Sequence, residues 1–200
     1  MSPVYKRKDH FYQKAKGEGL ASRAVYKLEE MDKRFRLLRL GSRVLELGCA
    51  PGGWLQYIVK KIGTTGKAIG VDLLPLKLNF PKHIQLLVGD ILDLKIQDQM
   101  IRLLGEKADV VLSDLSPNLS GVHFSDHIKS VELCEKALEV AQKTLKPNGA
   151  LVVKIFPGQD LENFKKKLKG YFGEMKPFIP EATRKSSNEL YLVGKFFKQL

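Results

Sequence analysis

Apolar residues in this chain gather in short runs, and several of the stretches between the runs repeat apolar positions with helical spacing. The runs have the length of buried strands, and they cover residues 43–48, 67–72, 84–88, 109–114, 149–155 and 190–197. Helical spacing extends over residues 22–38, with Ser22 as the expected N-cap, over Gly53–Ile62, over His127–Leu145 and, with a fainter pattern, over 95–104. Alternating strands and helices predict an α/β fold with a mostly parallel sheet covered by helices on both faces.

A glycine-rich turn (residues 48–53) follows the first run and leads into a helix that begins near Trp54. Such a turn lets a ligand lie against backbone amides and a helix N-terminus. Asp72 ends the next run, and a carboxylate about 20 residues beyond the glycines can accept hydrogen bonds from a ribose. This order predicts a cofactor that contains a nucleoside.

The turn departs from the dinucleotide-binding fingerprint Gly-x-Gly-x-x-Gly. Ala50 replaces the second glycine of the fingerprint, and Pro51 has no amide hydrogen to donate. Trp54 places a large side chain where a phosphate would need exposed backbone amides. These differences favour S-adenosylmethionine (AdoMet) over a nicotinamide or flavin cofactor. A tight turn with a purely structural role is the alternative.

Charged residues also stand at the ends of later runs. Asp90 and Asp114 each close an apolar run, and Lys154 lies inside the apolar stretch 150–156. A buried lysine must be paired, neutralised or placed at an open strand end, because burying an unpaired charge is costly. Since ligands of such sheets bind beyond the carboxyl ends of the strands, we expect these residues to share one site with Asp72. A structural salt bridge is the alternative for Lys154, and a helix cap is the alternative for each aspartate.

The net charge of +12 and the pI near 9.6 indicate a polyanionic partner. Residues 1–43 carry 12 Lys or Arg against 5 Asp or Glu, interleaved with Tyr5, His10, Phe11 and Tyr12. This mixture suits phosphate contacts and base stacking. We therefore expect residues 1–22 to be an extension that contacts the polyanionic partner; a solvated basic tail is the alternative. With 200 residues, 44% of them apolar, the chain is expected to form a single domain over residues 1–200. The second basic run, 165–169, is expected to be the wet face of a helix.

Nothing in the chain indicates a membrane or a secretory route. It has no apolar run of about 18 residues, and its first residues lack the apolar region of a signal peptide. Cys49 and Cys134 lie in buried patterns, and neither has a metal-ligand spacing. These features favour a reduced, cytoplasmic compartment.

Five short sequence blocks stand out along the chain: Ser22-Arg23-Ala24-Val25-Tyr26-Lys27-Leu28, Gly52-Gly53-Trp54, Ser113-Asp114-Leu115-Ser116-Pro117-Asn118, Val152-Val153-Lys154 and Ser187-Asn188-Glu189-Leu190-Tyr191. They belong to a match that runs in order from about residue 9 to residue 196. Together, and in this order, they closely resemble the FtsJ/RrmJ family of AdoMet-dependent RNA 2′-O-ribose methyltransferases. The departures are mild: Cys49 where alanine is common, and Asn188 where the bacterial pattern usually has arginine.

The resemblance implies a Rossmann-like sheet of seven strands with a last antiparallel strand. It implies a catalytic tetrad of Lys27, Asp114, Lys154 and Glu189. It also implies that AdoMet, with no metal, is held by Gly52, Trp54, Asp72, Asp90 and Asp114. We expect Glu189 to pair chiefly with Lys27, and Asp114 to orient Lys154, the candidate base.

Since the chain is compact, the resemblance favours the type of enzyme that methylates a uridine of large-subunit rRNA. We expect such an enzyme to be a monomer and to have no membrane or DNA partner. The alternatives are a tRNA anticodon-loop methyltransferase and a non-catalytic RNA-binding assembly factor; a nicotinamide-dependent oxidoreductase is a third. All four tetrad residues are present, which favours an enzyme over a decayed homologue.

Overall fold

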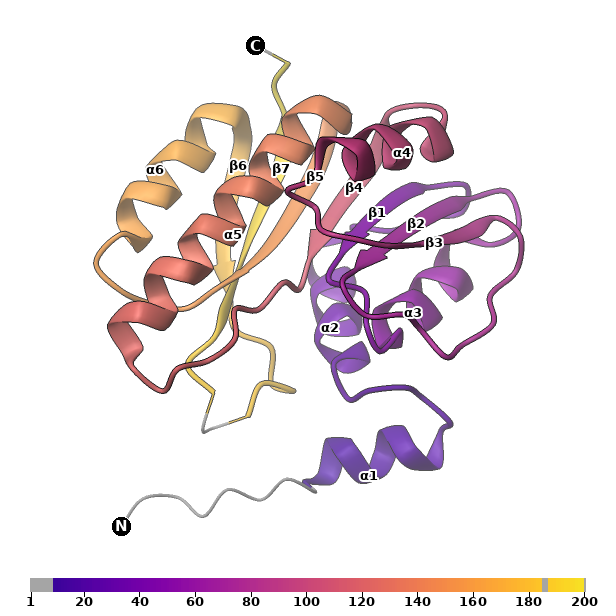
Figure 1. Ribbon diagram of the computed structural model, residues 1–200, viewed down its shortest axis with the longest axis horizontal. Coiled ribbons are helices and arrows are strands. Elements are labelled where there is room, and N and C mark those ends of the chain that lie inside the picture. The colour runs from indigo at the N-terminus through magenta and orange to yellow at the C-terminus, as the bar shows by residue number, and fades with distance from the viewer. Residues whose placement is uncertain (1–8, 185–186, 200) are drawn as a thin grey trace.

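The computed structural model describes residues 9–184 and 187–199, which form a seven-stranded sheet with helices on both faces (Figure 1). In chain order the elements are α1 (His10–Gly17), α2 (Val25–Phe35), β1 (Arg43–Leu47), α3 (Gly53–Ile62), β2 (Lys67–Asp72), β3 (Ile84–Val88), α4 (Leu94–Leu104), β4 (Ala108–Ser113), α5 (His123–Thr144), β5 (Leu145–Ile155), α6 (Leu161–Tyr171), β6 (Phe172–Phe178) and β7 (Leu190–Phe197).

The strand order is β3-β2-β1-β4-β5-β7-β6. Strands β1 to β5 pair in parallel, whereas β7 lies between β5 and β6 and runs antiparallel to both. This confirms the predicted Rossmann-like sheet with a last antiparallel strand. The order reverses between β1 and β4, so α3 and α5, the helices nearest to these strand ends, pack on opposite faces of the sheet. In sheets of this kind, the strand ends at such a reversal border the crevice in which ligands bind.

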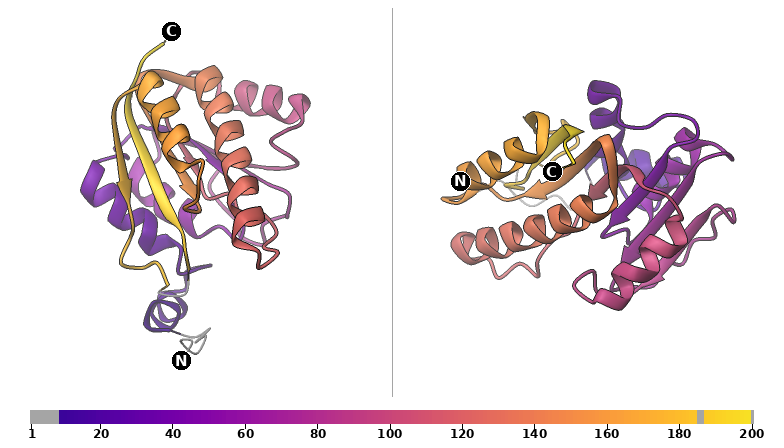
Figure 2. Two further views of the ribbon diagram at one scale, coloured as in Figure 1. Left: turned by 90° about the vertical axis from the view of Figure 1, so that its left-hand side faces the viewer. Right: turned by 90° about the horizontal axis from the view of Figure 1, so that it is seen from above.

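Alternate residues of the strands face two separate cores. Val111 packs in the core under α4, α5 and α6, whereas Val110 and Leu112 pack in the core under α2 and α3. The left view of Figure 2 shows the sheet between these two helix layers. Cys49 and Cys134 are buried free thiols, as their sequence context predicted.

Three helix boundaries differ clearly from the sequence-based expectation. Helix α2 ends at Phe35, three residues before the expected end, because Arg36 takes a left-handed conformation with φ 54°. Helix α2 begins at Val25, and its N-cap is Ala24 rather than Ser22, whose carbonyl accepts a hydrogen bond from the Val25 amide. Helix α5 begins at His123, four residues earlier than expected. The early start follows from Asp126, whose carboxylate accepts hydrogen bonds from the Ser120 and Gly121 amides and so closes the first turn.

Two elements were not expected from the chain pattern, namely α1 and β6. Helix α1 lies within the basic N-terminal segment, capped by Asp9, which accepts a hydrogen bond from the Tyr12 amide at 3.0 Å. Phe11 of α1 packs on Tyr26 of α2, with 5.5 Å between the ring centroids. The rest of the proposed RNA-contacting extension, residues 1–8 with Tyr5, lies outside the described residues.

The basic run 165–169 lies on α6, as predicted. Lys166, Lys167 and Lys169 are exposed, while Phe164 and Leu168 on the same helix are buried in the core. Among the helices in the described part of the chain, each is too short or too polar to cross a bilayer.

Candidate active site

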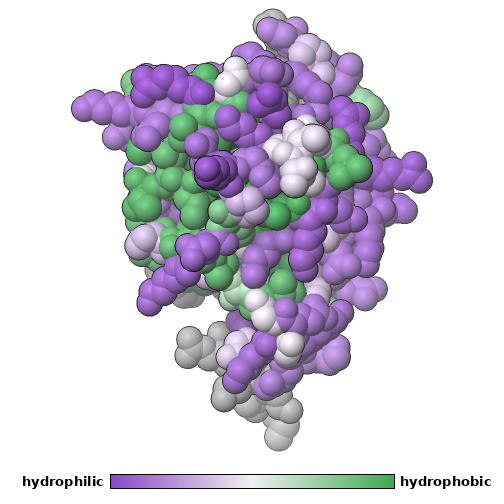
Figure 3. All heavy atoms as spheres, turned by 90° about the vertical axis from the view of Figure 1, so that its right-hand side faces the viewer, coloured by the Kyte–Doolittle hydropathy of each residue, from purple (hydrophilic) through white to green (hydrophobic). Residues whose placement is uncertain are grey.

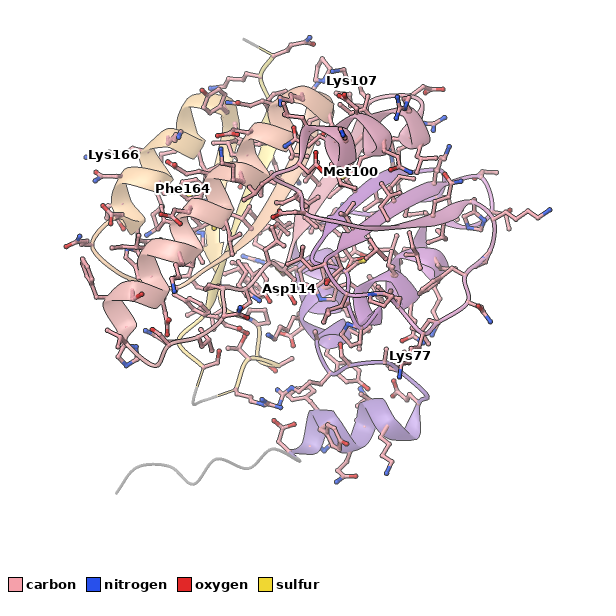
Figure 4. All side chains as sticks on the ribbon, viewed as in Figure 1. Lys77, Met100, Lys107, Asp114, Phe164 and Lys166 are labelled. Carbon is pink, nitrogen blue, oxygen red and sulfur yellow. The ribbon has the colours of Figure 1, made fainter. Side chains whose placement is uncertain are left out.

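Lys154 and Asp114 meet where β4 and β5 end. Ser113 of β4 pairs with Val153 of β5, so the next residue of each chain segment lies at the same edge of the sheet. Lys154 Nζ lies 3.1 Å from Asp114 Oδ1 and donates to the Asp114 backbone carbonyl at 2.8 Å. The two side chains are only 9% and 19% exposed. Asp114 lies near the middle of the molecule in Figure 4. Lys154 is therefore a buried lysine with a charged partner, one of the arrangements expected from the sequence.

Lys27 and Glu189 form a second, largely buried ion pair beside the first. Lys27 comes from α2 and donates through Nζ to Glu189 Oε1, just before β7. Its ammonium also lies 5.9 Å from the centre of the Tyr191 ring. The structure therefore brings the four tetrad residues together, in the two pairings expected from the sequence.

Tyr191 connects the two pairs, and the sequence analysis did not single it out. It stands opposite Lys154 in the antiparallel β5–β7 register and donates from its hydroxyl to Asp114 Oδ1 at 2.8 Å. Burial, together with the charges of Asp114 and Glu189, raises the pKa of Tyr191 well above its ordinary value. The phenol thus stays protonated and serves as a hydrogen-bond donor to Asp114. Its position two residues after Glu189 was the available signal.

The glycine-rich turn lies at the crevice between β1 and β4. Gly48 has φ +82°, and a Cβ there would stand 3.0 Å from the Leu115 amide nitrogen, so only glycine lets the loop after β4 approach this closely. Gly52 has φ +106°, and the side chain of Leu78 leaves no room for a Cβ there. Asp72 Oδ2 accepts a hydrogen bond from the Ala50 amide at 2.8 Å and so fixes the turn against the end of β2.

Trp54 and Asp90 take different places around this turn. The Trp54 indole is buried, and its Nε1–H donates to the Ala24 carbonyl at 2.7 Å, which joins the turn to the segment that leads into α2. The ring also packs on Tyr191, at 6.0 Å between centroids. Asp90 is exposed beyond the end of β3, and its Oδ1 accepts a hydrogen bond from the Leu92 amide at 2.9 Å.

Exposed apolar side chains flank the two strand-end carboxylates. Leu73 and Leu74 follow Asp72 directly, and Val88 and Leu92 flank Asp90. Figure 3 faces this side of the molecule and shows apolar side chains gathered among polar ones. Apolar surface beside carboxylates suits a ligand with a flat aromatic ring and a polyhydroxyl group, such as a nucleoside.

Glu46 is a further buried carboxylate that the sequence analysis missed. It lies in β1 and is 1% exposed, and its Oε2 has no hydrogen-bond partner among the described residues. Burial raises the pKa of Glu46 well above its ordinary value, and the nearby charges of Asp114 and Asp72 add to the effect. The sequence carried a signal for Glu46, because a charged residue inside an apolar run is the same pattern that singled out Lys154.

Glu46→Gln is expected to gain stability relative to the wild type as pH rises. Because the folded-state pKa is raised, the Glu46 contribution is fully present below the unfolded value of about 4.3 and is lost as pH rises through the folded value. Between these values the gap between the two free energies of unfolding grows by about 1.4 kcal/mol per pH unit. Urea unfolding from pH 4 to 8 measures it, with exposed Glu132→Gln as the control. A gap that is constant with pH would contradict a neutral Glu46.

A pocket of about 450 Å³ opens beside the Lys27–Glu189 pair. Arg23 and Arg184 also border it, and Phe156 provides apolar wall. Its size falls in the range of small-molecule sites. Asp114 and Lys154 are not among its bordering residues. The pocket thus reaches the tetrad from the side of α2, away from the glycine-rich turn.

The sheet order, the glycine-rich turn after β1 and the acids at the strand ends are those of a Rossmann-like protein. The sequence profile of the FtsJ-like methyltransferase family matches residues 20–197. The chain therefore belongs to the FtsJ-like methyltransferase family.

Two relatives are each named ribosomal RNA large subunit methyltransferase E. That of Desulfatibacillum aliphaticivorans is 45% identical over 94% of this chain and 89% of its own length. That of Methanothermobacter thermautotrophicus is 41% identical over 96% of this chain and 92% of its own length. Among solved structures, one named as a ribosomal RNA methyltransferase of Plasmodium falciparum matches with a TM-score of 0.73 at 28% identity, over 88% of this chain and 98% of that one.

Proposed function

We propose that this protein is an AdoMet-dependent RNA 2′-O-ribose methyltransferase that modifies a uridine of large-subunit rRNA, acting as a monomer in the cytoplasm. The observation that carries the proposal is the contact of Lys154 with Asp114 at the carboxyl edge of the sheet, with the Lys27–Glu189 pair beside it. The relatives named large-subunit rRNA methyltransferases support the choice of substrate.

The residues around the glycine-rich turn fit AdoMet. Gly52 lets the turn adopt φ +106°, and Asp72 and Asp90 offer carboxylates for ribose and amine donors. The Asp114 carboxylate suits a cation such as AdoMet, which carries a sulfonium and an ammonium group, and the neutral Glu46 keeps a buried oxygen, Oε2, without a partner among the described residues. Trp54 holds the turn against the segment leading into α2. When bound, AdoMet supplies an electrophilic methyl group, and it leaves as the thioether S-adenosylhomocysteine.

Lys154 is the base in this mechanism. In its neutral amine form, Nζ would accept the proton that the ribose 2′-hydroxyl loses while the hydroxyl oxygen bonds to the methyl carbon and the methyl–sulfur bond breaks, so the step needs no metal. Asp114 holds Nζ in place through both its carboxylate and its backbone carbonyl. Tyr191 in turn orients the Asp114 carboxylate. A fixed nucleophile and base convert the reaction to an in-line transfer within one complex.

Lys27 and Glu189 position the substrate ribose. They border the pocket on the side of α2, where a nucleotide can enter without crossing the glycine-rich turn. Their opposite charges cancel locally, so the pair offers donors and an acceptor to ribose hydroxyls without adding net charge to the site. The basic N-terminal segment, including α1, is proposed to contact the RNA backbone outside the pocket.

Transfer of a labelled methyl group from AdoMet tests the function. Incubation with large ribosomal subunits should give a labelled ribose that maps to one uridine of the rRNA, with little label in free tRNA. Label in the tRNA anticodon loop would instead support the tRNA enzyme, and RNA binding without any transfer would support an assembly factor. A change in NAD(P)H fluorescence on mixing would contradict the choice of cofactor.

A further inference from the structure

The carboxylate of Asp9, which caps α1, lies against two arginines that border the pocket. Its Oδ2 forms an ion pair with Arg23 Nη1 and lies 3.6 Å from Arg184 Nε. Both arginines border the same pocket as Lys27 and Glu189. An acidic side chain of the chain itself thus occupies a position between two cations at the entrance to the candidate active site.

The two oxygens of Asp9 have separate partners. Oδ1 accepts the hydrogen bond from the Tyr12 amide that caps α1, while Oδ2 faces the arginines. The Asp9 side chain is 28% exposed, whereas that of Arg23 is 11% exposed. Water therefore reaches the carboxylate, and the contact of Oδ2 with the arginines can be exchanged for another anion while the cap is kept.

Arg23 is held in place by contacts that do not involve Asp9. Its Nη2 donates to the Ala182 carbonyl, and its guanidinium lies 5.4 Å from the centre of the Phe11 ring. Burial lowers the pKa of Arg23, and the nearby positive charge of Arg184 lowers it further. The two guanidiniums are therefore close enough to repel each other, which is the situation that a shared anion relieves.

We propose that Arg23 and Arg184 form a binding site for a backbone phosphate next to the methylated nucleotide, and that the Asp9 carboxylate is the internal anion that this phosphate displaces. The inference rests on the proposed function, since it takes RNA as the substrate. Planar guanidiniums match phosphate oxygens in pairs, and the site lies at the edge of the pocket that Lys27 and Glu189 reach. Helix α1, seen below α2 in Figure 1, then follows the bound RNA instead of covering its path.

Asp9→Asn tests the proposal, because asparagine keeps the helix cap and removes the competing charge. Binding of a fluorescein-labelled single-stranded RNA of 12 nucleotides, followed by anisotropy, should tighten about twofold to fivefold, as expected for losing a partly exposed ion pair. The matched control is Asp93→Asn, which changes the net charge equally at the exposed N-cap of α4, and which should alter the dissociation constant less than about twofold. Equal effects of the two variants would overturn the proposal.

Arg184→Ala makes the test specific to the phosphate site. It should weaken RNA binding and reduce the slope of log affinity against log salt concentration by about one. In that background Asp9→Asn should tighten binding by a smaller factor than in the wild type, since the carboxylate then competes with phosphate for Arg23 alone. A full Asp9→Asn effect without Arg184 would overturn the pairing. Methyl transfer is measured separately. If the protein transfers methyl groups to RNA but Asp9→Asn does not change RNA binding, only this inference is overturned. If Asp9→Asn tightens RNA binding but no methyl group is transferred, only the proposed function is overturned, and a protein that does not bind RNA overturns both.

Discussion

Replacement of Lys154 by alanine is expected to slow methyl transfer to RNA at least about a hundredfold, because a positioned base contributes about 10² to 10⁴ in rate. AdoMet binding, measured by calorimetry, should change less than about threefold, since the lysine contacts Asp114 rather than the glycine-rich turn. A loss of binding as large as the loss of rate would make Lys154 a cofactor-binding residue and contradict its role as the base.

Lys154→Arg separates proton transfer from charge. Arginine keeps the positive charge beside Asp114 but cannot give up its proton in a protein. We expect it to be as inactive as the alanine variant while it retains more of the wild-type stability. Substantial activity in Lys154→Arg would show that the group acts by its charge alone. Thermal unfolding of both variants controls for misfolding.

Loss of one partner from the Lys27–Glu189 pair is expected to lower the free energy of unfolding by about 3 kcal/mol, because it leaves an uncompensated buried charge. Lys27→Met removes the ammonium while it keeps a long apolar side chain. Urea unfolding measures the loss. The exposed pair Lys136–Glu139 on α5 provides the control, and Lys136→Met should cost less than about 0.5 kcal/mol.

The double variant Lys27→Met/Glu189→Gln distinguishes structure from function at this pair. Without either charge, most of the stability should return, whereas methyl transfer should stay impaired because the ribose has lost the Lys27 ammonium and the Glu189 carboxylate. Recovery of both would mean that the pair only supports the fold. Wild-type stability in Lys27→Met would contradict a buried pair.

The parallel half of the sheet could be predicted from the sequence, because its strands are covered on both faces and therefore read as continuous apolar runs. Strand β6 could not. It is an edge strand with the sequence Phe-Gly-Glu-Met-Lys-Pro-Phe, and most of its residues are partly or fully exposed, so it has no apolar run to detect. Pro177 is tolerated there because an edge strand needs fewer ladder hydrogen bonds. Helix α1 was missed because its stability comes from the Asp9 cap and from Phe11 packing on Tyr26.

Some residues of the candidate site could likewise be predicted from the sequence, and others could not. Asp114 and Lys154 could be found because a charge at the end of an apolar run is anomalous without a partner. The contact of Tyr191 with Asp114 depends on the antiparallel register of β7 with β5, and its position two residues after Glu189 does not by itself predict that contact. The ion pair of Asp9 with Arg23 and Arg184 joins three distant parts of the chain, and so it too appears only in three dimensions.

Because β7 inserts between β5 and β6, the tyrosine that orients Asp114 and the partner of Lys27 both come from the final stretch of the chain. Lys27 itself is made 162 residues before Glu189. During synthesis, the parallel strands can assemble around the glycine-rich turn long before the antiparallel hairpin emerges. A nascent chain therefore carries the glycine-rich turn and Lys27 well before Glu189 and Tyr191, which complete the two pairs, are added.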